Sequence, residues 1–227
     1  TTEDGVRIEA WYVPAPAARG AVLLAHGNAG NISHRVDYAL MFHRLGYSLL
    51  LLEYRGYGRS EGRPSEEGTY ADARAAWRHL VAERGFPPER IVLVGESLGG
   101  AVVARLAAAE RPGALVLASS FVSVPELAAE LYPWLPARWL VRYRYDAQEA
   151  LGRVSSPVLI AHSRQDDIVP FRHGERLFAA VKGPKAFLEL AGGHNDGFLF
   201  TREAWREALG RFLAQHLPAG AMSPVPR

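Results

Sequence analysis

The chain contains no cysteine among its 227 residues. Without thiols it can form neither disulfide bonds nor thiolate metal sites, and a cysteine nucleophile is excluded. We therefore expect any covalent catalysis to use a different side chain, and we expect no metal and no cofactor.

A large charge imbalance and a long apolar run are also missing. The formal net charge is only +2 at neutral pH, so the composition does not require a nucleic-acid partner. No apolar run reaches the roughly 18 residues that a membrane-spanning helix needs. We expect a soluble chain, either cytoplasmic or held at a membrane by a segment upstream of Thr1, because the sequence opens without methionine.

Hydrophobic residues, by contrast, make up 48% of the chain. That is enough to bury one sizeable core, and no linker-like stretch divides the sequence. We therefore expect a single domain over residues 1–227. Its last part, 218–227, is rich in proline, glycine and alanine and is expected to fray.

Strand-like and helix-like patterns alternate along the chain. Apolar runs rich in β-branched residues predict strands, and apolar residues spaced three and four apart predict helices. The expected strands cover 6–13, 21–25, 48–53, 91–94, 114–119, 158–162 and 186–190, and the expected helices cover 36–45, 66–84, 101–110, 175–181 and 202–217. This alternation predicts an α/β fold with a mostly parallel central sheet flanked by helices.

The stretch that organises the site is the turn between residues 91–94 and 101–110. Ser97 lies at its apex, between Gly95 and Gly99 at the Gly-x-Ser-x-Gly spacing. A turn this tight leaves no room for side chains two residues away, and it presents the serine hydroxyl above the sheet. The alternatives are a plain glycine-rich turn or a phosphate site. A dinucleotide site would need glycine where Ser97 stands.

Two further loops carry site-like composition. Residues 26–31 follow a buried strand and could curl so that backbone N–H groups point inward. Residues 54–62 are rich in glycine and tyrosine, and their Arg55 could pair with Asp72 in a structural ion pair. Residues 121–149 break the strand and helix rhythm, so we expect a small helical cap above the carboxyl ends of the strands.

The cap has a mixed composition. Its aromatic residues suit either an acyl chain or simple packing on the core, and we leave both interpretations open. Three of its arginines, Arg138, Arg142 and Arg144, could contact nucleic acid or anionic lipid, but a solvated face is the commoner role.

An acid and a histidine complete the pattern, because Asp166 and His194 each follow a predicted strand. The order serine, acid, histidine at strand ends is that of the α/β-hydrolase fold. A serine becomes a nucleophile when a base takes its proton, and an acid is needed to orient that base.

The sequence resembles the α/β-hydrolase superfamily, and within it the Bem46-like (ABHD-type) group of serine hydrolases. The resemblance covers nearly the whole chain, from Val6 to about Leu217. Its marks are His26-Gly27-Asn28-Ala29-Gly30-Asn31, Tyr54-Arg55-Gly56-Tyr57-Gly58-Arg59-Ser60, Gly95-Glu96-Ser97-Leu98-Gly99-Gly100, Asp166-Asp167-Ile168-Val169-Pro170 and Gly193-His194-Asn195. Two positions depart from the family pattern, since Glu53 stands for an aspartate and Ser163 for a glycine.

The resemblance implies roles for particular residues. Ser97 would be the nucleophile, His194 the base and Asp166 the acid, with Asp167 as a rival for the last role. Backbone N–H groups of Asn28 and Leu98 would form the oxyanion hole.

These roles imply a hydrolase of carboxyl esters or thioesters that works through an acyl-enzyme, with lipid-like acyl groups among its candidate substrates. The partner would be a small-molecule substrate rather than nucleic acid. Membrane contact would involve the cap or a segment upstream of the chain. The alternatives are a peptidase or amidase with the same triad, or a non-catalytic binding module that keeps the fold.

Overall fold

The computed structural model describes residues 1–136 and 140–220. In this part of the chain, seven strands form one sheet in the order β1-β3-β2-β4-β5-β6-β7. The strands are β1 (Ala10–Val13), β2 (Gly20–Ala25), β3 (Tyr47–Leu52), β4 (Ile91–Glu96), β5 (Ala114–Ala118), β6 (Val158–Ser163) and β7 (Lys185–Leu190). Only β1 pairs antiparallel, with β3, and every other neighbouring pair is parallel.

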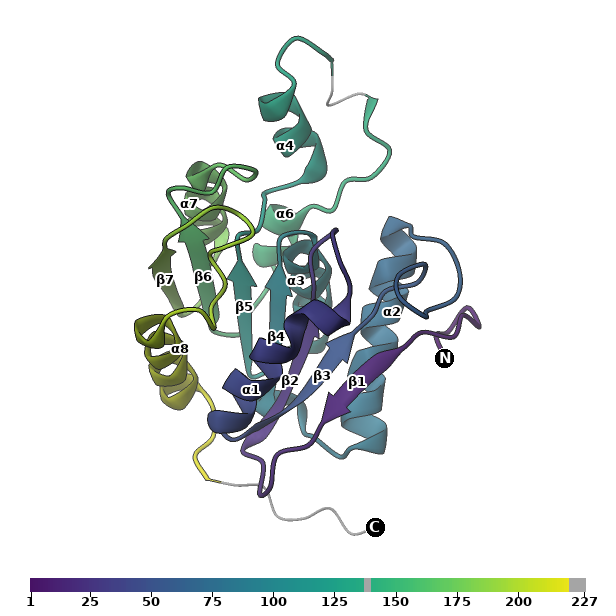
Figure 1. Ribbon diagram of the computed structural model, residues 1–227, viewed down its shortest axis with the longest axis vertical. Helices are drawn as coiled ribbons and strands as arrows, with labels where there is room; N and C mark the ends of the chain where they lie inside the picture. The colour runs from purple at the N-terminus through teal and green to yellow at the C-terminus, as the bar shows by residue number, and fades with distance from the viewer. Residues whose placement is uncertain (137–139, 221–227) are drawn as a thin grey trace.

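Helices cover both faces of the sheet (Figure 1). The α-helices are α1 (Val36–Arg44), α2 (Glu66–Arg78), α3 (Leu98–Glu110), α4 (Val124–Leu131), α6 (Ala147–Leu151), α7 (Phe171–Ala180) and α8 (Glu203–His216). Three short helical turns are η1 (Ile32–Arg35), η2 (His79–Glu83) and η3 (Pro88–Arg90). The α/β-hydrolase architecture expected from the sequence is therefore present.

The core has two halves because successive residues of a strand point to opposite faces. Leu23, Leu50 and Leu93 pack against α2, α3, α6 and α7 on one face. Their chain neighbours Val22 and Leu49 pack against α1 and α8 on the other. Burial on both faces explains why β2 to β5 read as continuous apolar runs in the sequence.

Three expected elements differ markedly in extent from the prediction, and one of them is α7, which begins at Phe171 rather than at Glu175. The strand predicted over 6–13 is reduced to β1, because Ala10 pairs with Leu52, the last residue of β3. Residues before β1 instead bond to the loop after β3, where Glu61 N–H donates to the Arg7 carbonyl. The helix predicted over 66–84 is α2 continued by the π-helical turn η2.

The segment predicted as a cap is helical in part. Helix α4 projects from the carboxyl ends of β5 and β6, and α6 lies closer to the body (Figure 1). Arg138 and Trp139 lie outside the described residues, as does 221–227 of the predicted frayed tail. Within the described ranges, no helix has the length and apolar character needed to cross a membrane.

The parallel arrangement determines where the site can form. The carboxyl ends of β2, β4, β6 and β7 lie along one edge of the sheet, and the loops that leave them begin at His26, Ser97, Arg164 and Ala191. In open α/β sheets this edge is where ligands bind.

Candidate active site

Ser97 occupies the sharp turn predicted from the glycine spacing. Its backbone has φ 49° and ψ −114°, a conformation that L residues rarely adopt, and it forms the N-cap of α3. A Cβ added at Gly95 would lie 2.4 Å from the Gly99 carbonyl oxygen, and one added at Gly99 would lie 2.0 Å from the Ala25 carbonyl oxygen. The two glycines therefore make the strained turn sterically possible.

The structure brings the three predicted side chains together. The Ser97 hydroxyl oxygen lies 3.1 Å from His194 Nε2, although the two residues are 97 positions apart. His194 Nδ1 lies 2.9 Å from Asp166 Oδ2 and 3.0 Å from Asp166 Oδ1. A histidine placed between a hydroxyl and a carboxylate can relay a proton to and from the hydroxyl.

Asp166 is held as a carboxylate. Its Oδ1 accepts hydrogen bonds from the N–H groups of Ile168, at 3.0 Å, and Val169, at 2.7 Å. Burial alone would raise the pKa of Asp166, but the hydrogen bonds from His194 and these N–H groups outweigh it and lower that pKa below its ordinary value.

The rival carboxylate, Asp167, contacts a different part of the histidine. Its Oδ1 accepts from the backbone N–H of His194 at 2.8 Å. It therefore contacts the backbone of the histidine loop, whereas Asp166 faces the ring.

Ser163 and Gln165 join the acid loop to the histidine loop. The Ser163 hydroxyl donates to the Gly192 carbonyl at 2.7 Å, and Gln165 Oε1 accepts from the Gly192 N–H at 2.8 Å. The departure from glycine at position 163 thus adds a hydrogen bond between the two loops. No pattern in the sequence indicated this contact, because it joins side chains to the backbone of a distant loop.

His162 lies behind the acid and is fully buried. Its Nε2 donates to the Val169 carbonyl at 2.9 Å and lies 3.6 Å from Asp166 Oδ2. Its Nδ1 has no hydrogen-bond partner among the described residues. Burial lowers the pKa of His162, which favours the neutral ring.

The loop after β2 passes close to the serine. A Cβ added at Gly27 would lie 3.4 Å from Ser97 Cβ, so the loop leaves room for about one methyl group beside the serine. The next residue, Asn28, accepts a hydrogen bond at its Oδ1 from the Tyr57 hydroxyl at 2.8 Å. Leu98, the second predicted oxyanion residue, opens α3, where helix N–H groups are free of helical partners.

Glu53, the second departure from the family pattern, binds two residues of this loop through its carboxylate. Its carboxylate is buried, with Oε1 2.9 Å from His26 Nε2 and Oε2 accepting from the Ile32 N–H at 3.1 Å. The Tyr54 hydroxyl donates to the His26 carbonyl at 2.9 Å. The longer glutamate thus joins both ends of the loop that carries Asn28.

Glu96, the neighbour of Ser97, forms a second network. Its two carboxylate oxygens each lie 2.5 Å from a partner, Arg35 Nε and the Tyr38 hydroxyl. Arg35 also stacks on Phe198, with its guanidinium carbon 4.9 Å from the ring centroid.

A cavity of about 230 Å³ opens at the serine. Its lining includes Ser97 and His194 and the predicted oxyanion residue Asn28. Phe198 and Ile168 supply apolar wall on the side of the histidine and acid loops. The sequence predicts no role in the cavity for either residue, because both belong to irregular loops without periodicity.

The predicted ion pair between Arg55 and Asp72 is present, but away from the cavity. Arg55 Nε donates to Asp72 Oδ1 at 2.9 Å, and the Arg55 N–H donates to Asp72 Oδ2 at 2.8 Å. Both side chains are buried, so the pair holds the loop after β3 against α2.

More than half of the chain matches a known protein family. Residues 20–151 match the family model described as the alpha/beta hydrolase fold. The chain belongs to the α/β-hydrolase family. This α/β hydrolase is 45% identical to the uncharacterized protein Rv2307c of Mycobacterium tuberculosis, over 94% of its own length and 77% of the relative's. It is 35% identical to the alpha/beta hydrolase domain-containing protein WAV2 of Arabidopsis thaliana, and the match covers 96% of this chain and 78% of WAV2.

Solved structures also resemble this α/β hydrolase. The esterase Pf2001 of Pyrococcus furiosus superposes with a TM-score of 0.79, at 19% identity, covering 95% of this chain and 90% of that one. At this identity the likeness shows the shared fold. The narrower Bem46-like placement stays a prediction.

The described residues of this α/β hydrolase contain no group of three or more histidine, aspartate or glutamate side chains arranged to hold a metal ion.

Proposed function

We propose that this chain is a serine hydrolase that cleaves carboxyl esters or thioesters. One observation carries the proposal, namely the continuous line of contacts from the Ser97 hydroxyl through the His194 ring to the Asp166 carboxylate, at 3.1 Å and 2.9 Å. Ser97 and His194 both line the cavity, so a substrate carbonyl could reach the hydroxyl.

In the first half-reaction, the Ser97 oxygen attacks the acyl carbon while His194 Nε2 takes the hydroxyl proton. Asp166 keeps a hydrogen on Nδ1, so that Nε2 is the basic nitrogen, and it stabilises the charged ring. The tetrahedral intermediate collapses, His194 gives its proton to the departing alcohol or thiol, and the acyl group stays on Ser97.

In the second half-reaction, water takes the place of the alcohol. His194 removes a proton from the water, which attacks the acyl-enzyme, and the carboxylic acid leaves as Ser97 regains its proton. The same three side chains therefore serve both halves of the cycle.

Two backbone N–H groups would bind the oxyanion. Leu98 N–H stands at the start of α3, where the helix dipole favours negative charge, and Asn28 lines the same cavity as Ser97. Each such donor is worth about 10²- to 10³-fold in rate. Tyr57 and Glu53 support this assignment, because they fix the loop on which Asn28 lies.

The size of the cavity favours short acyl groups. At about 230 Å³ it falls below the roughly 300–1,000 Å³ typical of sites for drug-sized ligands. The fold shared with the Pyrococcus furiosus esterase also supports ester substrates. A long acyl chain would extend beyond the cavity described here.

The test is hydrolysis of p-nitrophenyl esters of increasing acyl length, with and without Ser97→Ala. We expect turnover by the parent, highest for short acyl groups, and a loss of at least about 10⁴-fold in kcat for Ser97→Ala. Ser155→Ala is the matched control, because Ser155 is exposed and precedes β6 at the opposite end of the strand.

Two outcomes would contradict the proposal. One is equal turnover by the parent and Ser97→Ala, and the other is failure of the parent to react with a fluorophosphonate probe. An aminopeptidase substrate measured in parallel separates ester from amide specificity. Faster cleavage of the amide would replace the ester proposal with a peptidase.

A further inference from the structure

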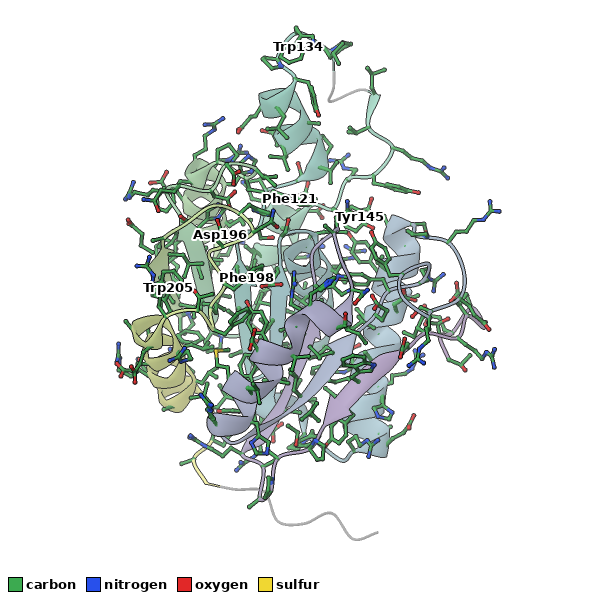
Figure 2. The ribbon with its side chains drawn as sticks, viewed as in Figure 1. Phe121, Trp134, Tyr145, Asp196, Phe198 and Trp205 are labelled. Carbon is green, nitrogen blue, oxygen red and sulfur yellow. The ribbon has the colours of Figure 1, made fainter. Side chains whose placement is uncertain are left out.

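The tip of the cap exposes a group of large apolar side chains. Trp134 is 73% exposed, and it stands at the end of the projection farthest from the body (Figure 2). The other members of this apolar tip are Leu131, Tyr132, Leu135 and Leu140, all exposed. Soluble proteins leave single apolar residues exposed, but a contiguous group on a projection marks an interaction site.

The charge around the tip is positive. Among residues 131–144, the part that the structure describes holds two arginines, Arg142 and Arg144, and no aspartate or glutamate. Arg142 is exposed and packs over the Tyr143 ring, 5.5 Å from its centroid. The Arg144 side chain is 76% exposed and lies 3.8 Å from Asp146, its acidic neighbour at the start of α6.

The acidic residues of α4 are already bound to cations of α7. Glu126 lies 3.1 Å from Arg176, and Glu130 lies 2.5 Å from Arg172 and 3.1 Å from His173. These contacts hold α4 on the body and neutralise its carboxylates. The exposed charges beside the apolar tip are therefore arginines.

The apolar tip projects from the edge of the sheet at which Ser97 lies, where the parallel strands have their carboxyl ends. The segment that leads to α4 starts at the end of β5, where the Ala118 carbonyl accepts from the Ser97 N–H at 2.9 Å. Ser120, in that segment, donates its hydroxyl hydrogen to the Ser97 carbonyl at 2.7 Å. If the tip binds to another surface, that surface would therefore face the edge of the sheet where Ser97 lies.

We propose that the apolar tip inserts into the interface of an anionic lipid bilayer. Tryptophan and tyrosine favour the headgroup region, and flanking arginines are attracted to anionic lipids. A protein partner needs roughly 20–30 residues on each side of a standard interface, whereas the described residues of this tip expose five large apolar side chains on a projection. Insertion into lipid needs no complementary shape, so the bilayer fits a small projection best.

The test is flotation of the purified chain with vesicles. Phosphatidylcholine vesicles with added phosphatidylglycerol should bind the chain, and phosphatidylcholine vesicles alone should bind it more weakly. Trp134→Ser should lower the partition coefficient about tenfold, because one large apolar side chain leaves the lipid. Arg142→Gln and Arg144→Gln should each lower it about fivefold, and added salt should do the same.

Trp11→Ser is the matched control, because Trp11 is an exposed tryptophan on the edge strand β1, far along the chain from the cap. It should bind vesicles as the parent does. All variants should keep the parental melting temperature, and Trp134→Ser should hydrolyse a soluble p-nitrophenyl ester at the parental rate. The vesicle assay is read independently of hydrolysis, so it stands even if the proposed function fails.

Three results would overturn the proposal. The first is no binding of the parent to phosphatidylglycerol vesicles, and the second is equal binding by the parent and Trp134→Ser. The third is a parental dimer that Trp134→Ser converts to a monomer in the absence of vesicle binding, which would assign the tip to a second copy of the chain.

Discussion

Asp166 and Asp167 are adjacent in the chain, yet they bind different atoms of His194. Asp166 accepts from the ring Nδ1 at 2.9 Å, and Asp167 accepts from the backbone N–H at 2.8 Å. The difference arises because the loop after β6 turns one carboxylate toward the ring and the other toward the backbone of residue 194. Their substitution should therefore have unequal effects.

We predict that Asp166→Asn lowers kcat by about 10⁴-fold, because an amide N–H facing Nδ1 favours the wrong tautomer of His194. Asp167→Asn keeps an acceptor for the His194 N–H and should cost less than about tenfold. Steady-state kinetics on a short-chain p-nitrophenyl ester compare the two. Equal losses of kcat in the two variants would show that contact with the His194 ring does not give Asp166 a larger role than Asp167.

Stability should decline on mild acidification because of His162. Burial lowers its pKa, so the folded chain takes up a proton less readily than the unfolded chain does. Its contribution to stability is therefore fully present above the unfolded pKa of about 6.5 and is lost as pH falls through the lower folded value. The ionisable groups that act on it are Asp166, His173 and His194.

His162→Gln should reduce this decline, since glutamine has no titratable proton and retains an N–H that can donate to Val169. The melting temperature should fall between about pH 7.5 and about pH 5.5 by a few degrees less in the variant than in the parent. His43→Gln is the control, because His43 is exposed on α1. Identical declines in the parent and His162→Gln would exclude His162 as a source of the pH dependence.

The buried pair Arg55 and Asp72 should be important for stability. Burial raises the pKa of Asp72 even though Arg55 acts against it, so loss of the guanidinium would leave an uncompensated buried carboxylate. Arg55→Met should lower the free energy of unfolding by about 3–5 kcal/mol.

Arg7→Met is its control, because Arg7 forms an exposed ion pair with Glu61, and its loss should lower the free energy of unfolding far less than Arg55→Met does. Urea denaturation measures both variants. If the two variants lose similar amounts of unfolding free energy, the burial of Asp72 does not make its ion pair with Arg55 important for stability.

The elbow glycines should tolerate no side chain. Gly99→Ala would place a Cβ 2.0 Å from the Ala25 carbonyl oxygen, against backbone that cannot move without shifting β2. We expect a loss of about 1–3 kcal/mol or more in the free energy of unfolding together with the loss of the proposed ester hydrolysis.

Gly183→Ala is the matched control, since its Cβ would meet nothing closer than 3.4 Å. Thermal unfolding and ester hydrolysis should be nearly unchanged in that variant. A stable, active Gly99→Ala chain would show that the elbow relaxes more than the packing around Ala25 implies.

Some features of the site were accessible to sequence reasoning because they depend on neighbouring residues. The turn at Ser97 follows from glycines two positions away on each side. The pairing of Arg55 with Asp72 follows from the placement of Arg55 in a loop and of Asp72 in the helix predicted directly after it. The predicted extent of the first strand was wrong, because the length of β1 depends on where β3 ends. The continuation of α2 as η2 was likewise not visible in the apolar spacing.

By itself, the sequence determined the alternation of strands and helices, and the order in which serine, acid and histidine occur at strand ends. These properties are local, since side-chain periodicity and glycine spacing act over a few residues. Only the tertiary structure decided that Asp166 rather than Asp167 faces the His194 ring, and that Glu53 and Tyr57 hold the loop of Asn28. Such contacts depend on the paths of loops that leave different strands, and those paths exist only once the sheet has assembled.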